Sequence, residues 1–467
     1  MSRVIQKKVL ASLPLAVLLV ASFGIQTAQS QSLSDSLAAA YQTNPTLLAE
    51  RANLRSIDEH LPQALSAWRP TVQITSSIGR TLYSETHTAD FRSTPLNNAL
   101  TITQPLFVGA ANSAIARSKE EIQAERARLF DSEQTVLLNV ATAYFNLLRD
   151  QATLDLQVKN EQVLSTQLDA TRDRFQVGEV TRTDVSQAEA ALAGAVASRI
   201  GAEGNLAVSR ASFLQVVGIP AGVVRPVDAP EALLPKTVDE ATQTAATDNP
   251  SVVAAQFDEN AARNHVGELI GGLLPSAQLV GTYSSVRQSA AAAGFIGSSG
   301  NFTIDTTSLV AQLTIPLYES GSIYSQVRAA KQLASKARTT IDINRRQAIQ
   351  SAQSAYQSLV SARAQITSLR AQIEASTVAL EGVRQEANVG SRTVLDILNA
   401  EQLLVNSQVT LVQSQRDSLV AAYTLLDAVG RLTAKSLGLN VPLYDYEAYF
   451  REYKNAWWGT EIDDSDR

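Results

Sequence analysis

The chain has 467 residues, of which 45% are hydrophobic and 18% are charged, and its formal net charge is −6. This balance excludes intrinsic disorder, and after residue 30 no apolar run approaches the ~18–20 residues that a membrane-spanning helix needs. Cysteine is absent and the three histidines lie far apart in the sequence, so we expect no disulfide, no metal site and no cofactor. The acidic balance argues against a nucleic-acid partner.

Residues 1–30 have the pattern of a secretory signal peptide. A basic start is followed by the apolar residues 9–20 and then by small residues at positions 28–30, with an A-x-A-like spacing. A membrane anchor is the alternative, but the apolar stretch is short and polar residues follow it at once. We therefore expect an exported chain.

Two copies of one unit occupy most of the remaining sequence. Asn44-Pro45 recurs as Asn249-Pro250 at an offset of 205 residues, and beyond the strands the offset becomes 212 and stays constant. Because Pro, Gly, Tyr and Asp recur in register, and not only Ala, we interpret the chain as a duplication. The predicted divisions are a first repeat at 31–218, a proline-rich connector at 219–237, a second repeat at 238–430 and a C-terminal segment at 431–467.

Each repeat begins with a predicted helix, at 34–68 and at 238–274. After Pro70, alternation of apolar and polar residues predicts a strand, and a polar tip leads into a returning strand that we expect to end at Pro105 or Pro316. This gives four strands per chain.

Long helical hairpins follow each strand pair. Residues 110–177 and 322–381 contain no Gly or Pro, which predicts helices far longer than the average of ~11–12 residues. Apolar residues at alternating steps of three and four indicate coiled-coil packing. Gly178 and Gly390 mark the expected reversals, after which second helices return toward Gly218 and Gly430.

Four strands cannot close a barrel, and an open sheet edge cannot face lipid. If these strands enter a membrane, several copies of the chain must therefore share one barrel, as in the outer membrane of bacteria. Phe107 and Tyr318 occupy equivalent positions just past the predicted strand ends. They fit an interfacial aromatic girdle, although they would also fit the cap of a soluble core.

The duplicated order, the early Asn-Pro, the T-x-x-P-L-[FY] strand ends and the V-G-x-x-T-x-x-D turns resemble the TolC family of outer-membrane channels over residues 31–440. The resemblance implies a mostly α protein with a small β part. Three chains would form a homotrimer with one 12-stranded barrel in outer-membrane lipid and a long periplasmic helical tunnel. The C-terminal segment would pack around the waist of this tunnel.

The implied function is that of a passive exit duct, not of an enzyme. The duct would work with a periplasmic adaptor (membrane fusion) protein and an inner-membrane pump or ABC transporter, in multidrug efflux or type I protein secretion. A soluble exported coiled-coil protein, such as an adaptor or a structural protein, is the alternative. It would explain export and long helices but not a duplicated pair of strands.

The resemblance also implies a gate at the hairpin turns. Asp396 would contribute to an acidic ring around the periplasmic aperture, Arg392 would pair toward Thr183, and Asp184 would belong to the same lock. Asn399 stands where a second acid is often found. The Thr-x-x-Asp pattern of both turns equally predicts helix N-caps, which alone would account for the two acids.

Two further features of the turns bear on the gate and on the adaptor. Ala387 stands where an aromatic hydroxyl could have bonded to the lock, so Ala387 and Asn399 together predict a weaker closed state. The hairpin tips Val177-Gly178 and Val389-Gly390 are expected to contact the adaptor. Their glycines would also be needed simply to reverse the chain.

Overall fold

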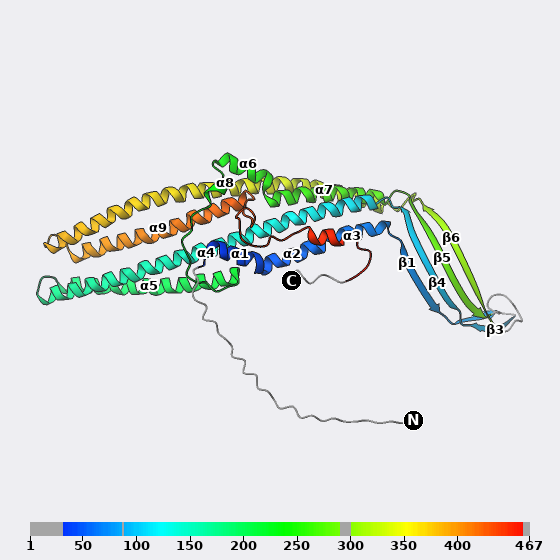
Figure 1. Ribbon diagram of the computed structural model, residues 1–467, viewed down its shortest axis with the longest axis horizontal. Coiled ribbons are helices and arrows are strands. Elements are labelled where there is room, and N and C mark those ends of the chain that lie inside the picture. Colours follow the sequence, from blue (N-terminus) through cyan, green and yellow to red (C-terminus); the bar gives the residue numbers. More distant parts are fainter. Residues whose placement is uncertain (1–30, 86–87, 290–299, 461–467) are drawn as a thin grey trace, which may run out of the picture.

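The computed structural model describes residues 31–85, 88–289 and 300–460. The predicted signal peptide, most of the polar tip of the second strand pair and the acidic end of the chain lie outside these residues. The molecule is elongated, with two long helical hairpins along its axis and a β-sheet extending from one end (Figure 1). Within the described residues, no helix is both long and apolar enough to cross a membrane.

The two hairpins confirm the predicted long helices. Helix α4 has 66 residues and α8 has 67, and each returns through a shorter partner, α5 or α9. Gly178 and Gly390 at the reversals have φ of 81° and 80°, a left-handed conformation that glycine adopts without steric cost. The bounds are α4 Ala111–Gln176, α5 Arg182–Val217, α8 Ser322–Asn388 and α9 Val394–Ala428.

The predicted single helices at 34–68 and 238–274 are wrong, because each is broken at its Asn-Pro. Proline disfavours helical backbone in the residue before it, and Asn44 and Asn249 are extended, with ψ of 123° and 126°. Each asparagine then caps the following helix. The resulting elements are α1 Leu33–Thr43, α2 Pro45–Asp58, α3 His60–Leu65, the 3₁₀ turn η1 Ser66–Trp68, α6 Val238–Asp248 and α7 Pro250–Gly271.

The same two asparagines also hold the ends of the return helices. The Asn44 side-chain amide donates to the carbonyl of Val216 at 3.0 Å, and the Asn249 amide donates to the carbonyl of Ala428, also at 3.0 Å. The repeated Asn-Pro is therefore a clamp: proline breaks the helix, and asparagine binds the last turn of α5 or α9.

The predicted four strands are present, one antiparallel pair in each repeat, and they form one sheet in the order β1-β4-β5-β6, which the sequence did not predict. A separate two-stranded extension, β2-β3, was not predicted. Pro105 lies inside β4 at a register shift, not at the strand end, because an irregularity can accommodate a residue that lacks an N–H group. The strands are β1 Thr71–Ile78, β2 Thr81–Glu85, β3 Thr88–Ser93, β4 Leu96–Phe107, β5 Ser276–Ser289 and β6 Asn301–Thr314.

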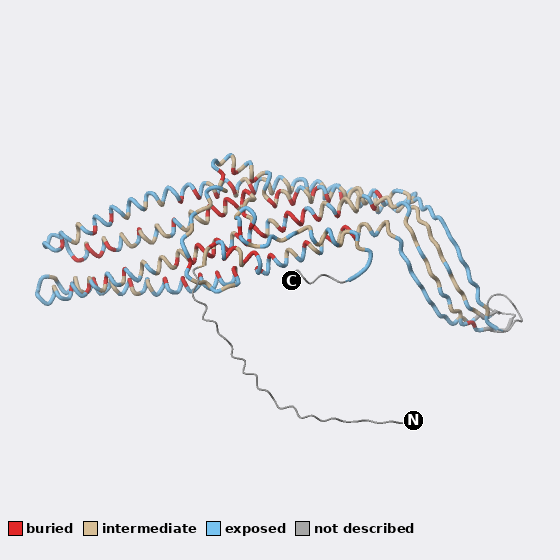
Figure 2. Tube along the Cα trace, in the orientation of Figure 1, coloured by how far each residue is buried: buried red, intermediate tan, exposed pale blue. Residues whose placement is uncertain are grey.

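The main core lies at the middle of the molecule, where buried residues gather (Figure 2). There α1 and α2 pack on α4, and the connector and the C-terminal segment, which contains α10 Ala448–Tyr453, cover them. Tyr144 is fully buried and its hydroxyl lies 3.0 Å from the carbonyl of Gln31 and 2.8 Å from that of Arg225. Its repeat counterpart Tyr356 donates to the carbonyl of Lys236 at 3.0 Å. Each repeat thus ties the connector to its long helix through one tyrosine.

Candidate functional site

The two hairpin turns lie at the end of the molecule opposite the sheet (Figure 1). Each reversal is bracketed by an ion pair: Arg174 Nε lies 3.0 Å from Glu179, and Arg392 Nε lies 2.9 Å from Glu386. Positions 174 and 386 are repeat equivalents, but their partners are not, because Glu179 corresponds to Ser391 and Arg392 to Val180. Each turn thus has an ion pair across its reversal, with the arginine before the reversal in the first repeat and after it in the second. The tip valines beside them, Val177 and Val389, are 72% and 80% exposed.

Both predicted helix caps are present. Thr181 accepts a hydrogen bond from the Asp184 N–H at 3.3 Å, and the Thr181 N–H donates to the Asp184 carboxylate at 2.8 Å. Thr393 and Asp396 repeat this capping box, at 3.3 Å and 3.0 Å. Hydrogen bonds from the Thr393 N–H and hydroxyl, together with the charge of Arg392, hold the pKa of Asp396 below its usual value. Asp396 therefore carries a negative charge at neutral pH.

The structure brings Arg392 to Glu386 of its own hairpin, and among the described residues Arg392 forms no hydrogen bond with Thr183. The hydrogen bond to Glu386, together with the charge of that carboxylate, raises the pKa of the Arg392 guanidinium. Thr183 and Asn399 are both exposed. Within this chain, Arg392 therefore forms an ion pair inside the second turn, and the inter-hairpin link implied by the resemblance stays a prediction.

An apolar contact joins the two hairpins just behind the turns. Val394 and Leu398 of α9 pack against Leu164 of α4 and Ala195 of α5. On the other side of α9, Ile397 packs with Ala387 of α8. Asp396 and Asn399 therefore occupy the part of the α9 surface that neither contact uses. Ala387 is 2% exposed, so this position serves the packing of the hairpin itself.

In the described part of the chain, the sheet presents exposed apolar side chains and two unpaired edges. Strands β1 and β6 each have one neighbour there, so the outer edge of each is open. Ile74 of β1 is 77% exposed and Leu309 of β6 is 72% exposed. Phe107 ends β4, not just beyond it, and is 44% exposed, whereas Tyr318 lies past β6 and is 79% exposed.

Sequence reasoning missed a charged network near the junction of the helices with the sheet. His60 and Glu121 lie 3.0 Å apart, Arg117 bridges Glu121 and Glu268 at 2.8 Å each, and Glu268 lies 3.1 Å from His265. Two of the three histidines, distant in sequence, thus share one network across α3, α4 and α7. The positions of His60 and His265 in the sequence do not indicate that the two side chains belong to one network. Within the described residues, no group of three or more His, Cys, Asp or Glu side chains could hold a metal ion.

Comparison with known proteins relates both repeats to one family. The family described as Outer membrane efflux protein matches residues 37–218 and 241–431. The outer membrane efflux protein BepC of Brucella suis is 34% identical over 440 residues, covering 94% of each chain. The outer membrane protein TolC of Escherichia coli is 24% identical over 435 residues, covering 91% of this chain and 87% of that protein.

Solved structures share the fold. The outer membrane protein VceC of Vibrio cholerae superposes with a TM-score of 0.72 at 21% identity, covering 85% of this chain and 96% of that one. The outer membrane channel CmeC of Campylobacter jejuni gives 0.74 at 17% identity, with 90% and 89% covered. Because the matches extend over both repeats and nearly the whole chain, the protein belongs to the outer membrane efflux protein family, whose members are channel proteins of the bacterial outer membrane.

Proposed function

We propose that three copies of this chain form one exit duct across the outer membrane, coupled to a periplasmic adaptor and an inner-membrane transporter. The observation that carries this proposal is the four-stranded sheet with two open edges. Unpaired N–H and C=O groups cannot face lipid, so β1 and β6 must pair with other chains. The strands have 8, 12, 14 and 14 residues, enough on average for the ~9–11 that a tilted transmembrane strand needs.

The duplication specifies how the chains would pair. In the first repeat Thr71 pairs with Thr103, and in the second their equivalents Ser276 and Thr314 pair in the same way. The contact between the repeats pairs Thr103 with Val280. Applying the same repeat offsets places Thr314 of one chain opposite Thr75 of the next.

This register can be tested directly, because the chain has no native cysteine. A Thr75→Cys, Thr314→Cys double variant should form intermolecular disulfides in outer-membrane fractions and give a covalent ladder that stops at three chains. The matched control is Thr75→Cys with Gln312→Cys, which shifts the register by two residues and moves the sulfur atoms beyond bonding distance. A product that remains monomeric, or a ladder that does not stop, would refute the proposal.

For the cargo, we favour small molecules over proteins. BepC, named an efflux protein, is 34% identical over 94% of this chain, whereas the alkaline protease secretion protein AprF of Pseudomonas aeruginosa is 24% identical over 73% of it. Deleting the protein should therefore increase the accumulation of a fluorescent dye in cells. Unchanged dye accumulation together with a protein missing from the medium would favour secretion instead.

At the turns, we propose a gate in which Asp396 forms the charged ring, with Asn399, Asp184 and Thr183 around it. The support is that Asp396 is ionised and lies on the unpacked surface of α9. Three such carboxylates around one pore would attract cations and repel anions. Asn399 adds no charge, so the ring would be weaker than one with two acids per chain.

In this proposal the Arg392–Glu386 pair stiffens the second turn. Arg392→Ala should loosen the turn and raise single-channel conductance in a planar lipid bilayer. The matched control is Arg174→Ala, which breaks the Arg174–Glu179 ion pair of the first turn but leaves Asp396 and its neighbours in place. If Arg392→Ala and the unmodified protein have equal single-channel conductance, Arg392 does not contribute to the gate.

The exposed tips Val177-Gly178 and Val389-Gly390 would meet the adaptor. Val177→Asp and Val389→Asp should therefore reduce dye efflux in cells without changing conductance or the Thr75–Thr314 cross-link. If both variants export dye normally, the adaptor binds elsewhere.

A further inference from the structure

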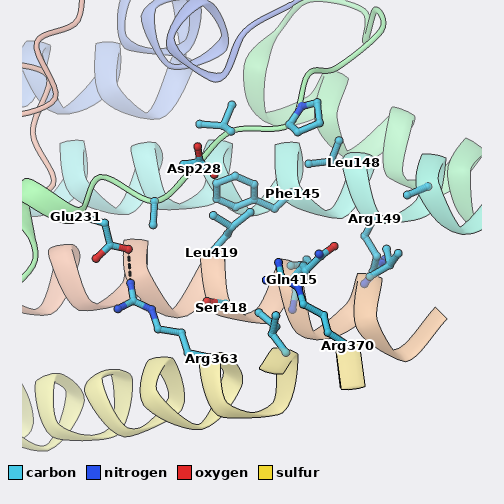
Figure 3. Close-up of a pocket in the computed structure, with 17 residues that line it drawn as sticks. Phe145, Leu148, Arg149, Asp228, Glu231, Arg363, Arg370, Gln415, Ser418 and Leu419 are labelled. Carbon is cyan, nitrogen blue, oxygen red and sulfur yellow. Dashed lines mark hydrogen bonds and ion pairs between the residues drawn. The ribbon is translucent and has the colours of Figure 1, made fainter. Parts of the chain in front are cut away.

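A cavity of about 690 Å³ lies between the two hairpins near the middle of the molecule. It is lined by α4, α8, α9 and connector residues 226–231 (Figure 3). This size is within the ~300–1,000 Å³ of typical small-molecule sites. The cavity is distant from both the turns and the sheet, and none of the functions discussed above uses it.

The cavity combines an apolar lining with arginines. Apolar side chains come from all four segments, among them Phe145, Val227, Ile366 and Leu419. In Figure 3, Arg363 and Arg370 extend from α8 toward α9 and the connector. The full set of charged lining residues is Arg149, Asp228, Glu231, Arg363, Arg370 and Arg416.

Three of the four arginines already have partners. Arg149 binds the adjacent Asp150 through two hydrogen bonds at 2.7 Å and 2.9 Å, and Arg363 binds Glu231. Arg416 donates to Asn146 at 2.8 Å and to Asp417 at 2.7 Å. Among the described residues, two lining charges form no ion pair: Arg370, which is exposed on the α8 side of the cavity, and Asp228 of the connector. Figure 3 places them at opposite sides of the cavity, so the guanidinium of Arg370 lies next to apolar lining without a carboxylate beside it.

We propose that this cavity binds a single-chain amphipathic carboxylate, with its head group on Arg370 and its alkyl chain over the apolar lining. A guanidinium binds a carboxylate through two parallel hydrogen bonds, and Arg370 is available for this because each of the other three lining arginines is neutralised by its own carboxylate partner. The ligand must also have an alkyl chain, because a small anion would leave the apolar lining of the cavity exposed to water. A cationic amphiphile would meet repulsion from Arg370.

A protection assay tests this site in the trimer, reconstituted in lipid nanodiscs. Val412 lines the cavity and is half-buried, and Val412→Cys introduces the only thiol of the chain. Dodecanoate should slow maleimide modification of this cysteine by about tenfold at saturation. Dodecylamine, which has the opposite charge, and butyrate, which lacks the long chain, should not. A Val360→Cys reporter, exposed on α8 outside the lining, should not respond to any of the three.

The charge requirement is tested on the Val412→Cys background. Arg370→Gln should abolish protection by dodecanoate, Arg370→Lys should retain part of it, and Arg338→Gln, an exposed arginine elsewhere on α8, should retain all of it. Protection by dodecanoate that survives Arg370→Gln, or equal protection by dodecylamine, would overturn the proposal. A Val412→Cys thiol that is unreactive without ligand would also overturn it, because the cavity would then be covered by a neighbouring chain.

Discussion

Arg384 on α8 donates to Glu401 on α9 at 2.8 Å, and the equivalent residues of the first repeat, Arg172 and Glu189, form the same ion pair at 2.7 Å. The two pairs differ in burial. The Glu401 side chain is 4% exposed and one of its carboxylate oxygens has no hydrogen-bond partner in the described structure, whereas Glu189 is 49% exposed. Duplication preserved the chemistry, but the packing around the second pair makes its carboxylate depend on Arg384.

Arg384→Ala should consequently cost more stability than Arg172→Ala. Losing Arg384 leaves a buried carboxylate without its cation, which should lower the free energy of unfolding by roughly 1–3 kcal/mol. Losing an exposed pair costs about 0–1 kcal/mol. Urea unfolding followed by circular dichroism measures both. Adding Glu401→Gln to Arg384→Ala should restore most of the loss, and equal losses in the two single variants would contradict the assigned burial effect.

The Asn-Pro clamps predict a graded effect of substitution at Asn44. Asn44→Ala removes the N-cap of α2, worth about 0.5–2 kcal/mol, and the bond to Val216, worth about 0.5–1.5 kcal/mol. Asn44→Asp keeps the cap but loses the amide donor, so its melting temperature should lie between those of Asn44→Ala and the unmodified protein. Asn249 should show the same order. Identical melting temperatures of the Asp and Ala variants would mean that the cap contributes nothing.

Asp58 predicts a pH dependence. It is 2% exposed and neither carboxylate oxygen has a hydrogen-bond partner in the described structure. Burial raises the pKa of Asp58 to about 6, although the nearby Arg126 charge opposes this. The folded chain therefore holds a proton that the unfolded chain releases, so the free energy of unfolding should fall as the pH rises from about 4 to 6.

Asp58→Asn should remove this contribution and stabilise the protein at about pH 8 by roughly 1–2 kcal/mol. Urea midpoints at about pH 5 and pH 8 provide the measurement. Burial and the charge of Asp131 also raise the pKa of Asp427 to about 6, so a smaller dependence of the same sign should persist in the variant. If Asp58→Asn is instead less stable than the unmodified protein at about pH 8, the ionised carboxylate of Asp58 contributes to stability and the prediction is wrong.

Glycines at the ends of the two return helices should respond differently to alanine. Gly218 and Gly430 have φ of 82° and 75°, which alone costs alanine about 1–2 kcal/mol. A Cβ on Gly218 would lie 3.6 Å from Thr43 Oγ1, but one on Gly430 would lie 2.6 Å from the Asp248 carbonyl oxygen. Gly430→Ala should therefore lower the melting temperature well below that of Gly218→Ala. Similar values would indicate that the α6–α7 junction yields to the added methyl group.

The sequence predicted the long helices and their reversals because these depend on local properties, namely long runs without Gly or Pro and single glycines that need positive φ. The packing between helices was predicted less completely. Alternating steps of three and four residues from Leu137 predict that Leu147, Val158 and Leu168 are buried along α4. Leu147 and Leu168 are buried, but Val158 is 45% exposed while Asn160 is 6% exposed. A straight helix drifts by about 20° per heptad against a strict repeat, so the buried face of α4 follows the predicted positions only in part.

At the turns, too, features that depend on neighbouring residues were predicted, whereas contacts between residues farther apart were not. Both capping boxes were predicted, because each depends only on a threonine and an aspartate three residues apart. Capping was accordingly the alternative role predicted for Asp184 and Asp396. The Arg392–Glu386 pair was missed because its partners are six residues apart across the reversal. The apolar contact of Leu398 with Leu164 was also missed, since it joins segments that meet only after both hairpins have formed.

The clamps at Asn44 and Asn249 make each hairpin a lever. Both return helices are held at their C-terminal ends by the clamps. Helix α5 has 36 residues and therefore extends about 54 Å from this fixed end to the hairpin tip. A tilt of about 6° at the clamp would therefore displace the tip by roughly 5 Å. Small rearrangements of the side chains around the clamps are thereby amplified at the hairpin tips, so in the proposed gate a residue that never approaches the aperture can still set its width.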